Sequence, residues 1–346
     1  MTFLVDVLNM RGVALIVSLL VGCGNAEGSA VPDLGPAPPP GPVAMRADEN
    51  PRLLRRFRPL RRLELADGEQ IALGKMLYFD TRLSGGRDLS CNSCHELDHF
   101  GVDSRAVSIG HNGKLGQRNT PTVYNTAQHI ALFWDGRAAD LEQQVSSPIL
   151  DPSEMAMLDA RSVEKALKGI PGYVAAFGRA YPGEPIDLPH VARAIAAFER
   201  TLVTPSRWDR YLEGDRTALT KAENAGLKLF ADIGCVQCHT GELVGASMFQ
   251  KVGVVEKWPN QADQGRYMVT NLDADRMVFK VPSLRNVALT GPYFHDGSVT
   301  TLGTAIAMMA KHQLGTELTD EEVSSIETWL KTLGGTTVNV TAPALP

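Results

Sequence analysis

Two short stretches decide the fold of this 346-residue chain: Cys91-Asn92-Ser93-Cys94-His95 and Cys235-Val236-Gln237-Cys238-His239. Both have the form CxxCH, in which two thiols add to the vinyl groups of one porphyrin and the adjacent histidine becomes an axial ligand of the iron. Together they use four of the five cysteines. The sequence therefore predicts two covalently bound c-type haems.

Two other uses of paired cysteines are open from the spacing. A structural zinc site uses CxxC pairs, but it draws four ligands from one cluster and would leave His95 and His239 without a role. A disulfide within each pair suits an oxidising compartment and leaves both histidines equally unexplained. Haem attachment accounts for the cysteines and the histidines together.

The residues before each motif resemble one another. Leu73-Gly74-Lys75-Met76-Leu77-Tyr78-Phe79 precedes the first motif and Ala225-Gly226-Leu227-Lys228-Leu229-Phe230 precedes the second. In each, apolar residues recur three and four positions apart beside a glycine, which predicts a helix packed closely on a neighbour. This duplication indicates two domains of the same kind.

Other segments predict further helices. Thr220 with Glu223, and Thr319 with Glu322, have the spacing of a capping box at a helix start, and Gly334-Gly335 is a stop signal for the second of these helices. Residues 191–203 are amphipathic and end before Pro205. Strand-like alternation is rare. We therefore expect a mainly α protein with two cytochrome c-like domains, each around one covalently bound c-type haem.

The N-terminal residues predict export. Arg11 precedes an apolar stretch, residues 12–21, which is too short to span a bilayer and suits a signal peptide over residues 1–22. Leu20-Val21-Gly22-Cys23 resembles the bacterial lipobox, in which the cysteine is lipidated; the alternative is an ordinary signal peptide cut near Ala26 or Ala30. We expect a periplasmic protein, anchored as a lipoprotein if Cys23 is lipidated.

The rest of the chain divides into three expected parts. Residues 23–50 are rich in glycine, alanine and proline, which predicts a flexible tether. Residues 51–205 would form the N-terminal cytochrome c domain and residues 206–346 the C-terminal one. A formal net charge of -5 with mixed signs argues against nucleic acid as a partner.

The order of several blocks resembles the bacterial diheme cytochrome c peroxidase family, which is related to the methylamine-utilisation diheme enzymes. The blocks, between about Leu63 and Leu333, are FDTRLSGGRDLSCNSCH, SIGHNGKLGQRNTPT, FWDGRAADLEQQ, FERTLVTP, VPSLRNVALTGPYFHDGSV and the stretch through MMAKHQLG. The resemblance implies reduction of hydrogen peroxide to water with electrons from a small cytochrome c or cupredoxin. It also implies a homodimer, with peroxide at the haem of His95 and electron entry at the haem of His239.

The resemblance also implies roles for particular residues. His111, in a glycine-rich loop, matches the displaceable ligand of the first iron. Glu154 matches the residue that moves a proton between the peroxide oxygens, and Gln144 matches a residue on the same side of that haem. Trp134 matches a tryptophan between the two haems; a buried core tryptophan is the plain alternative.

A calcium site and a second iron ligand are implied in the same way. Asn119, with the carbonyl oxygens of Thr290 and Pro292, matches the interdomain calcium site of the family. Met309 matches the sixth ligand of the second iron, with Met308 beside it as a competitor.

Two other functions stay open. A related diheme oxidase that modifies a protein or organic substrate would carry a tyrosine at the place of Met309, and residues 305–314 contain none. A non-catalytic diheme electron-transfer protein would keep both irons six-coordinate. Lys280 departs from the family pattern, which predicts at this position an arginine that contacts a haem propionate.

Overall fold

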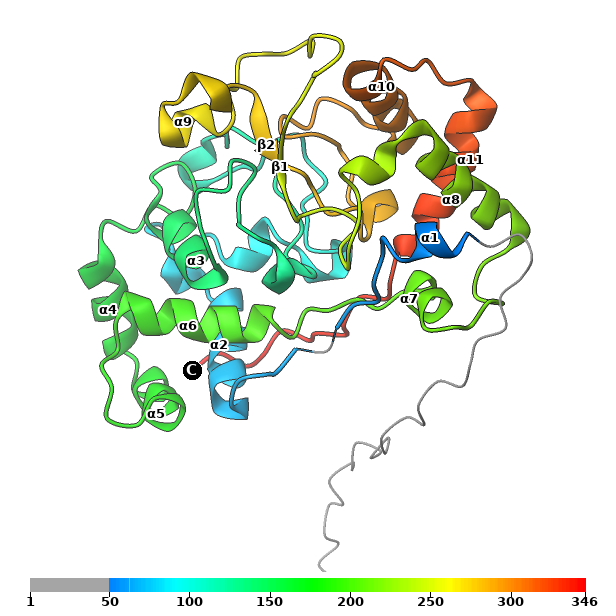
Figure 1. Cartoon of the computed structure of the whole chain (residues 1–346). Helices are drawn as coiled ribbons and strands as arrows, with labels where there is room; N and C mark the ends of the chain where they lie inside the picture. Colours follow the sequence, from blue (N-terminus) through cyan, green and yellow to red (C-terminus); the bar gives the residue numbers. More distant parts are fainter. Residues whose placement is uncertain (1–49, 62) are drawn as a thin grey trace, which may run out of the picture. The chain divides into compact units, whose positions relative to one another are not determined.

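The structure is a computed structural model that describes residues 50–61 and 63–346 and is mainly helical there (Figure 1). The predicted signal peptide, Cys23 and all but the last residue of the predicted tether lie outside the described residues. The helices are α1 (Pro51–Leu54), α2 (Gly68–Phe79), α3 (Leu141–Leu150), α4 (Ala160–Lys168), α5 (Pro171–Ala180), α6 (Leu188–Glu199), α7 (Arg207–Leu212), α8 (Lys221–Ile233), α9 (Tyr267–Thr270), α10 (Leu302–Leu314) and α11 (Asp320–Leu330). Strands β1 (Phe249–Lys251) and β2 (Val278–Lys280) pair antiparallel, with Phe249 opposite Lys280.

The helix before the first motif, α2, packs closely on α6. A Cβ added to Gly74 would come within 1.8 Å of the carbonyl oxygen of Ala194, so only glycine allows this approach. Leu73 and Leu77 of α2 are buried in the apolar core that α2, α5 and α6 share. The predicted close packing of this helix is confirmed.

The helix before the second motif, α8, packs on α11 in the same manner. A Cβ at Gly226 would come within 2.1 Å of the carbonyl oxygen of Ser325. Both helices begin with the predicted capping boxes. Thr220 and Glu223 exchange hydrogen bonds at the start of α8, and Thr319 and Glu322 do so at the start of α11.

Two predicted helix limits are wrong. The helix expected over residues 191–203 is α6, which begins at Leu188 because Asp187 accepts a hydrogen bond from the backbone N–H of His190, and ends at Glu199. The helix expected to stop at Gly334 is α11, which ends at Leu330; a 3₁₀ turn, Lys331–Leu333, follows before the glycine.

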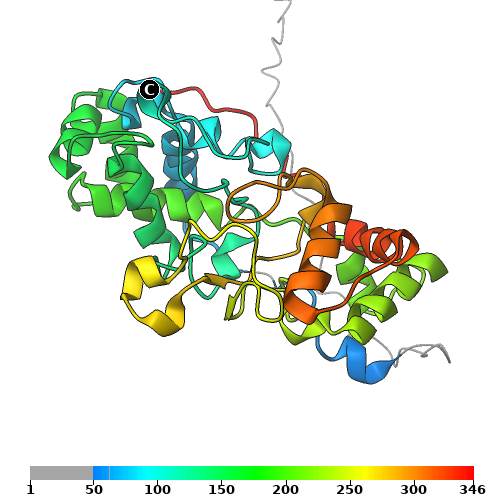
Figure 2. The same cartoon turned by 90° about the horizontal axis from the view of Figure 1, so that it is seen from above.

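The helices gather in two groups with long loops between them (Figures 1 and 2). One group contains α2 to α6, and the other contains α8, α10 and α11. The buried apolar residues form a large cluster in each group. The C-terminal residues after α11 return to the first group, where Val338 and Val340 pack against its core and Arg82 donates to the carbonyl of Pro346.

A turn between the two groups occurs twice. Asn125 and Asn286 both have a positive φ, 62° and 61°, and each is followed at once by a 3₁₀ turn. Eight residues later, Phe133 and Phe294 again share a positive φ, 64° and 70°. The side chains of both asparagines donate to the hydroxyl of Thr204, at 2.8 and 2.9 Å. The duplication therefore extends beyond the haem motifs and their preceding helices.

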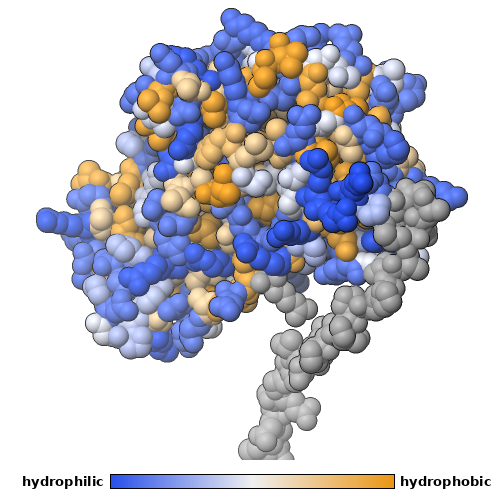
Figure 3. Space-filling model, in the orientation of Figure 1, coloured by the Kyte–Doolittle hydropathy of each residue, from blue (hydrophilic) through white to orange (hydrophobic). Residues whose placement is uncertain are grey.

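The surface mixes polar and apolar residues on the face shown in Figure 3. Among the described residues, no helix is both long and apolar enough to cross a membrane.

Candidate functional site

The first CxxCH motif folds as a 3₁₀ turn over Cys91–Ser93. The N–H of His95 donates to the carbonyl of Cys91 at 2.9 Å, which brings the two cysteines and the histidine into one turn. Nδ1 of His95 lies 3.3 Å from the carbonyl oxygen of Gly101, and the hydroxyl of Tyr78 donates to the carbonyl of His95 at 2.7 Å. The imidazole is thus held through its Nδ1 side.

The second motif has the same geometry. A 3₁₀ turn covers Cys235–Gln237, and the N–H of His239 donates to the carbonyl of Cys235 at 3.0 Å. Nδ1 of His239 lies 3.1 Å from the carbonyl oxygen of Val244. The ring of Phe230, from α8, lies beside that of His239, with centroids 6.3 Å apart. Helix α8 therefore supplies one wall beside this histidine.

The protonation states suit metal ligation. Burial lowers the pKa of His95, and it lowers the pKa of His239 to about 4, so both imidazoles are neutral at pH 7. A neutral imidazole that donates from Nδ1 carries its lone pair on Nε2, the form that binds iron. Burial also raises the pKa of the Cys91 thiol, and that of Cys235 to about 12.

The other interpretations of the cysteine pairs find no further support. In the described part of the chain, no disulfide joins the cysteines of either motif. Within residues 50–61 and 63–346, no three or more histidine, cysteine or acidic side chains gather as a metal site would require. Cys91 borders the apolar cluster of the first helix group and Cys235 that of the second, so the pairs do not share one site.

His111 lies in a short loop that is fastened to the turn carrying Glu154. The N–H of His111 donates to the carbonyl of Glu154 at 2.8 Å, and the ammonium of Lys114 donates to the carbonyl of Pro152 at 3.0 Å. A Cβ at Gly110 would come within 1.9 Å of the carbonyl oxygen of Ser153. The structure thus brings together two residues that are 43 positions apart in the sequence.

The Glu154 carboxyl group is partly buried beside the first motif. Burial, aided by the charge of Asp151, raises its pKa, while Arg137 opposes that shift. Burial raises the pKa of the Cys94 thiol, and the charges of Asp103 and Glu154 add to that shift. A carboxyl group in such surroundings holds a proton more readily than one in water.

Gln144 lies on α3, onto which the Glu154 turn folds back. The N–H of Met155 donates to the carbonyl of Pro148 in α3 at 3.1 Å. The Gln144 side chain is half-buried, and among the described residues no hydrogen bond joins it to Glu154 or His111. The hydrogen bond from Met155 to Pro148 therefore joins the Glu154 turn to the helix that carries Gln144.

Trp134 lies between segments from both halves of the chain. Its Nε1–H donates to the carbonyl of Asn119 at 2.9 Å, and its own carbonyl accepts from the N–H of Lys280 at 2.8 Å. Its ring meets that of His295 edge to face and packs against the apolar cluster around Phe279. Trp134 is thus fixed by main-chain contacts on two sides.

The predicted calcium ligands come from neighbouring segments. Asn119 is buried, and its N–H donates to the carbonyl of His295, three residues after Pro292, at 2.8 Å. Its side-chain amide donates to the carbonyl of Arg105 at 2.9 Å, and the hydroxyl of Thr290 donates to the carbonyl of Asn286 at 3.3 Å. In the described part of the chain, no hydrogen bond links Asn119 to Thr290 or Pro292.

Met308 and Met309 both pack against the apolar cluster that Trp134 borders. On α10, Met309 follows Ile306 by three positions and Leu302 by seven, and these two pack in the core beside the second motif. Residues at such spacing share one helix face. Met309 shares that face, while Met308 lies three positions after the buried Ala305, and both remain candidates for the ligand.

Buried Lys280 contacts half-buried His129, and no anionic side chain of the described residues forms an ion pair with Lys280. Lys280 is 8% exposed, and its ammonium lies 2.9 Å from Nδ1 of His129. Burial lowers the pKa of Lys280 to about 8, and Nε2 of His129 has no hydrogen-bond partner within the described residues. Since a buried cation is normally paired, both side chains fit the carboxylate of a bound group such as a haem propionate.

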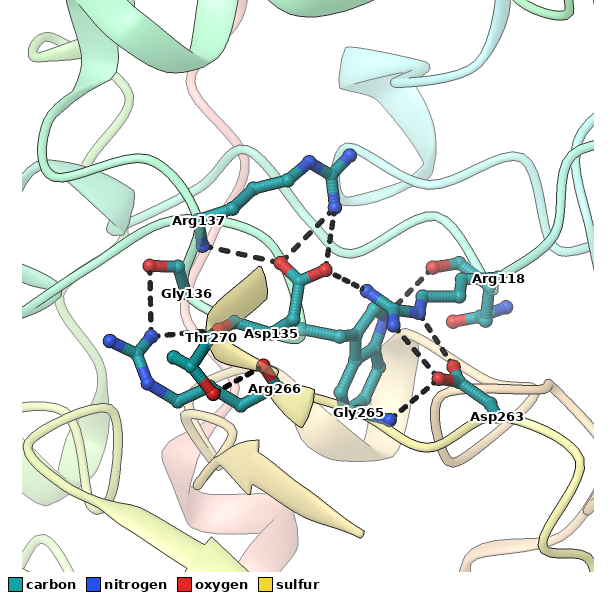
Figure 4. Close-up of polar contacts among 10 residues, drawn as sticks. Arg118, Asp135, Gly136, Arg137, Asp263, Gly265, Arg266 and Thr270 are labelled. Atoms are coloured by element: carbon teal, nitrogen blue, oxygen red, sulfur yellow. Dashed lines mark hydrogen bonds and ion pairs between the residues drawn. The ribbon is translucent and has the colours of Figure 1, made fainter. Parts of the chain in front are cut away.

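A network of ion pairs ties the Trp134 segment to the loop before α9. Figure 4 shows the carboxylate of Asp135 accepting hydrogen bonds from Arg118 and Arg137. Arg118 also binds Asp263 through two hydrogen bonds, at 2.6 and 2.8 Å. Arg266 donates to the main-chain carbonyl of Asp135 at 3.0 Å. This network holds residues 118–137 against residues 263–266.

Some residues of this region were not predicted. Asp88, whose carboxylate contacts His111, and His295, whose ring contacts Trp134, carry no signal of their own in the sequence. The repeat of Asp-Gly at residues 135–136 and 296–297 was a usable signal for His295, because it aligns that histidine with Trp134.

Comparisons with known proteins find a family, several relatives and solved structures that are similar to this chain. The family described as di-haem cytochrome c peroxidase matches residues 68–217. The cytochrome c551 peroxidase of Nitrosomonas europaea is 44% identical over 84% of this chain and 87% of its own length. That of Pseudomonas aeruginosa is 44% identical over 80% of this chain and 82% of its own length. The crystal structure of a MauG-like protein associated with microbial copper homeostasis has a TM-score of 0.71 and 29% identity, covering 84% of this chain and 96% of that one.

Proposed function

The chain belongs to the di-haem cytochrome c peroxidase family, and from this premise we propose that it reduces hydrogen peroxide to water with electrons from a small cytochrome c or cupredoxin. One molecule of peroxide takes up two electrons and two protons and yields two molecules of water. The observation that carries the proposal is that His111 contacts both the Glu154 turn and Asp88, which lies three residues before the first haem-attachment motif.

Two c-type haems would be held by the two repeated turns. Cys91, Cys94 and His95 would hold the first, and Cys235, Cys238 and His239 the second. When bound, the haems supply iron that exchanges electrons and activates the peroxide bond. The rest of the chemistry falls to side chains that bind, orient and move protons.

Glu154 would move the proton. Peroxide cleavage requires that the proton on one oxygen reach the other, so that water can leave. The raised pKa of Glu154 suits a group that takes up a proton and returns it. Gln144, on the neighbouring helix α3, would orient the peroxide through its amide.

His111 would control access. In the closed arrangement of its loop, the His111 imidazole would help to hold the first iron, and movement of the loop would withdraw it. Such movement would break the hydrogen bond from the His111 N–H to the Glu154 carbonyl. Release of the ligand and exposure of the proton-transfer group would therefore occur together.

Electrons would enter at the second haem and pass toward the first. The thioether of Met309 would help to hold the second haem, and a thioether favours the reduced iron. Trp134 would lie on the path, as its packing against the cluster that also contacts Met309 suggests. In this arrangement residues 51–205 and 206–346 would be the two cytochrome c domains.

Calcium, dimerisation and location complete the proposal. Asn119, with the carbonyls of Thr290 and Pro292, would bind one Ca²⁺ between the halves of the chain, and chelation followed by calcium addition would test this by loss and return of activity.

A homodimer would appear in analytical ultracentrifugation. Export to the periplasm, with lipidation of Cys23, would be tested by fractionation and fatty-acid labelling of a Cys23→Ala variant.

Stopped-flow mixing of the half-reduced protein with peroxide tests the central claim. Glu154→Gln keeps the shape of the side chain but removes its proton-transfer capacity, and turnover should fall by about 10²–10⁴-fold. Glu69→Gln, at an exposed ion pair with Arg179, is the control and should keep full turnover. Unchanged turnover in Glu154→Gln would remove that residue from the mechanism.

The same experiment separates the other functions. A non-catalytic electron carrier would show no spectral change with peroxide. A diheme oxidase would react with peroxide but fail to reoxidise the reduced donor protein catalytically.

A further inference from the structure

Asp88 lies three residues before Cys91 and accepts a hydrogen bond from His111. Nδ1 of His111 is 3.0 Å from Oδ2 of Asp88 and 3.3 Å from Oδ1. The carboxylate is itself held in place, because the hydroxyl of Ser84 donates to its Oδ1 at 3.1 Å and accepts from the Asp88 N–H at 3.0 Å. Ser84 is buried, so Asp88 is attached to a fixed turn.

The His111 ring is covered although its loop lies at the surface. Its side chain is only 19% exposed, whereas the neighbours Asn112 and Gly113 are exposed. Gly86 lies against the ring, since a Cβ added there would come within 2.4 Å of Cε1 of His111. Residues 84–88 therefore form the surface against which the His111 imidazole packs.

The contact with Asp88 determines which ring nitrogen of His111 is available to bind iron. A carboxylate that accepts from Nδ1–H fixes the tautomer whose lone pair is on Nε2 and makes that nitrogen more basic. Carboxylates that hold ligating histidines in this way typically contribute about 10–100-fold to metal affinity. An exposed ion pair that does not position a ligand would contribute little to the stability of the protein.

We infer that Asp88 is a positioning residue for His111: it presents Nε2 to the first iron, holds the ring in the closed position of its loop, and so sets how readily the loop opens. The inference rests on the proposed role of His111 as a displaceable ligand. Gly86 serves the same position by leaving room for the ring.

The test measures ligation of the first haem in the fully oxidised holoprotein, apart from peroxide turnover. Electron paramagnetic resonance gives the ratio of high-spin to low-spin iron, and cyanide binding reports whether the sixth position is free. In Asp88→Ala both the high-spin ratio and the rate of cyanide binding should rise about 10-fold. Asp88→Glu, which keeps a carboxylate, should restore part of the wild-type value.

Gly86→Ala is the second variant. Its added methyl group would meet both Cε1 of His111, at 2.4 Å, and Oδ1 of Asp88, at 2.7 Å, so it should disturb their contact and raise the high-spin ratio in the same direction. Two controls should match the wild type. Gly178→Ala adds a methyl group on α5, where nothing lies within 4 Å, and Glu96→Ala removes the carboxylate of the nearby pair with His99.

Two outcomes separate this inference from the proposed function. If His111→Ala frees the sixth position while Asp88→Ala and Gly86→Ala keep the wild-type spin state and cyanide rate, the role of Asp88 is overturned and the peroxidase proposal stands. If His111→Ala leaves the spectrum unchanged, His111 is no ligand, and the inference falls together with that part of the proposed function.

Discussion

The rings of Trp134 and His295 meet edge to face, with centroids 6.4 Å apart and planes inclined at 72°. They hold equivalent places in the two repeated turns, each directly after a phenylalanine with positive φ. Asn119 joins them, because its N–H donates to the carbonyl of His295 and its carbonyl accepts from Nε1–H of Trp134. The duplicated halves thus meet at a contact between equivalent residues that differ in chemistry.

Trp134→Phe should separate the contribution of the packed aromatic ring from that of the Nε1–H hydrogen bond. The variant keeps an apolar ring beside His295 but loses the donor to Asn119, so the free energy of unfolding should fall by about 1 kcal/mol. If the indole lies on the electron path, peroxide turnover should also fall, by about tenfold or more. Reoxidation of the second haem after mixing with peroxide measures this step.

Trp258→Phe is the matched control for that experiment. Trp258 is a buried indole in the same apolar cluster, in contact with Phe294. It should lose stability but keep its turnover. Equal turnover in wild type and both variants would leave Trp134 with a packing role alone.

Arg118 should contribute strongly to stability because it binds two carboxylates at once. Its side chain is 17% exposed, and Asp135 and Asp263 are 5% and 20% exposed. Arg118→Ala would leave both carboxylates without this cation, which should lower the free energy of unfolding by about 3–5 kcal/mol. The free energy of unfolding of Arg118→Lys should lie between those of the wild type and Arg118→Ala, since one ammonium group cannot reproduce the two-pronged contact.

Urea unfolding, followed by circular dichroism, measures these differences. Arg179→Ala is the control, because its ion pair with Glu69 is about half exposed and should contribute at most about 1 kcal/mol. A loss in Arg118→Ala no larger than that control would show that the network of Figure 4 does not hold the two segments together.

The helices were predictable where the signal is local. Capping boxes and the three-and-four spacing predicted α8 and α11 because both act within one or two helical turns. The start of α6 was missed although Asp187 and Pro189 are a cap followed by a proline in the first turn. The helix was predicted to start at Val191 because the apolar pattern begins there.

The candidate site was predictable only in part. The residues that would attach each haem follow from spacing within five positions. The contacts that surround them join distant residues: His111 with Asp88 across 23 positions, and Lys280 with His129 across 151. Such pairs depend on how the loops fold onto one another, and no periodicity in the sequence reports that.

Gly74→Ala and Gly226→Ala should both disrupt a helix pair. Each added methyl group would meet a main-chain carbonyl oxygen, at 1.8 and 2.1 Å, which cannot move without shifting the neighbouring helix. We expect the free energy of unfolding to fall by about 1–3 kcal/mol in each. Gly178→Ala, in open space on α5, should raise it by about 0.5–1 kcal/mol through helix propensity. Similar values for all three variants would contradict the close packing.

Glu199 should make stability depend on pH. Its carboxyl group lies at the end of α6, is 5% exposed, and has no hydrogen-bond partner within the described residues. Burial raises its pKa to about 8, against an ordinary value of 4.5, so the folded protein holds a proton there that the unfolded chain has lost. The stabilisation is complete below about pH 4.5 and is lost as the pH rises toward 8.

Glu199→Gln isolates this effect because glutamine stays neutral at every pH. The difference in unfolding free energy between Glu199→Gln and the wild type should be smallest near pH 4.5 and grow toward pH 8, by at most about 1.4 kcal/mol per pH unit. A flat difference for Glu199→Gln would mean that the carboxylate is ionised in the folded protein, with a cation or donor close enough to offset its burial.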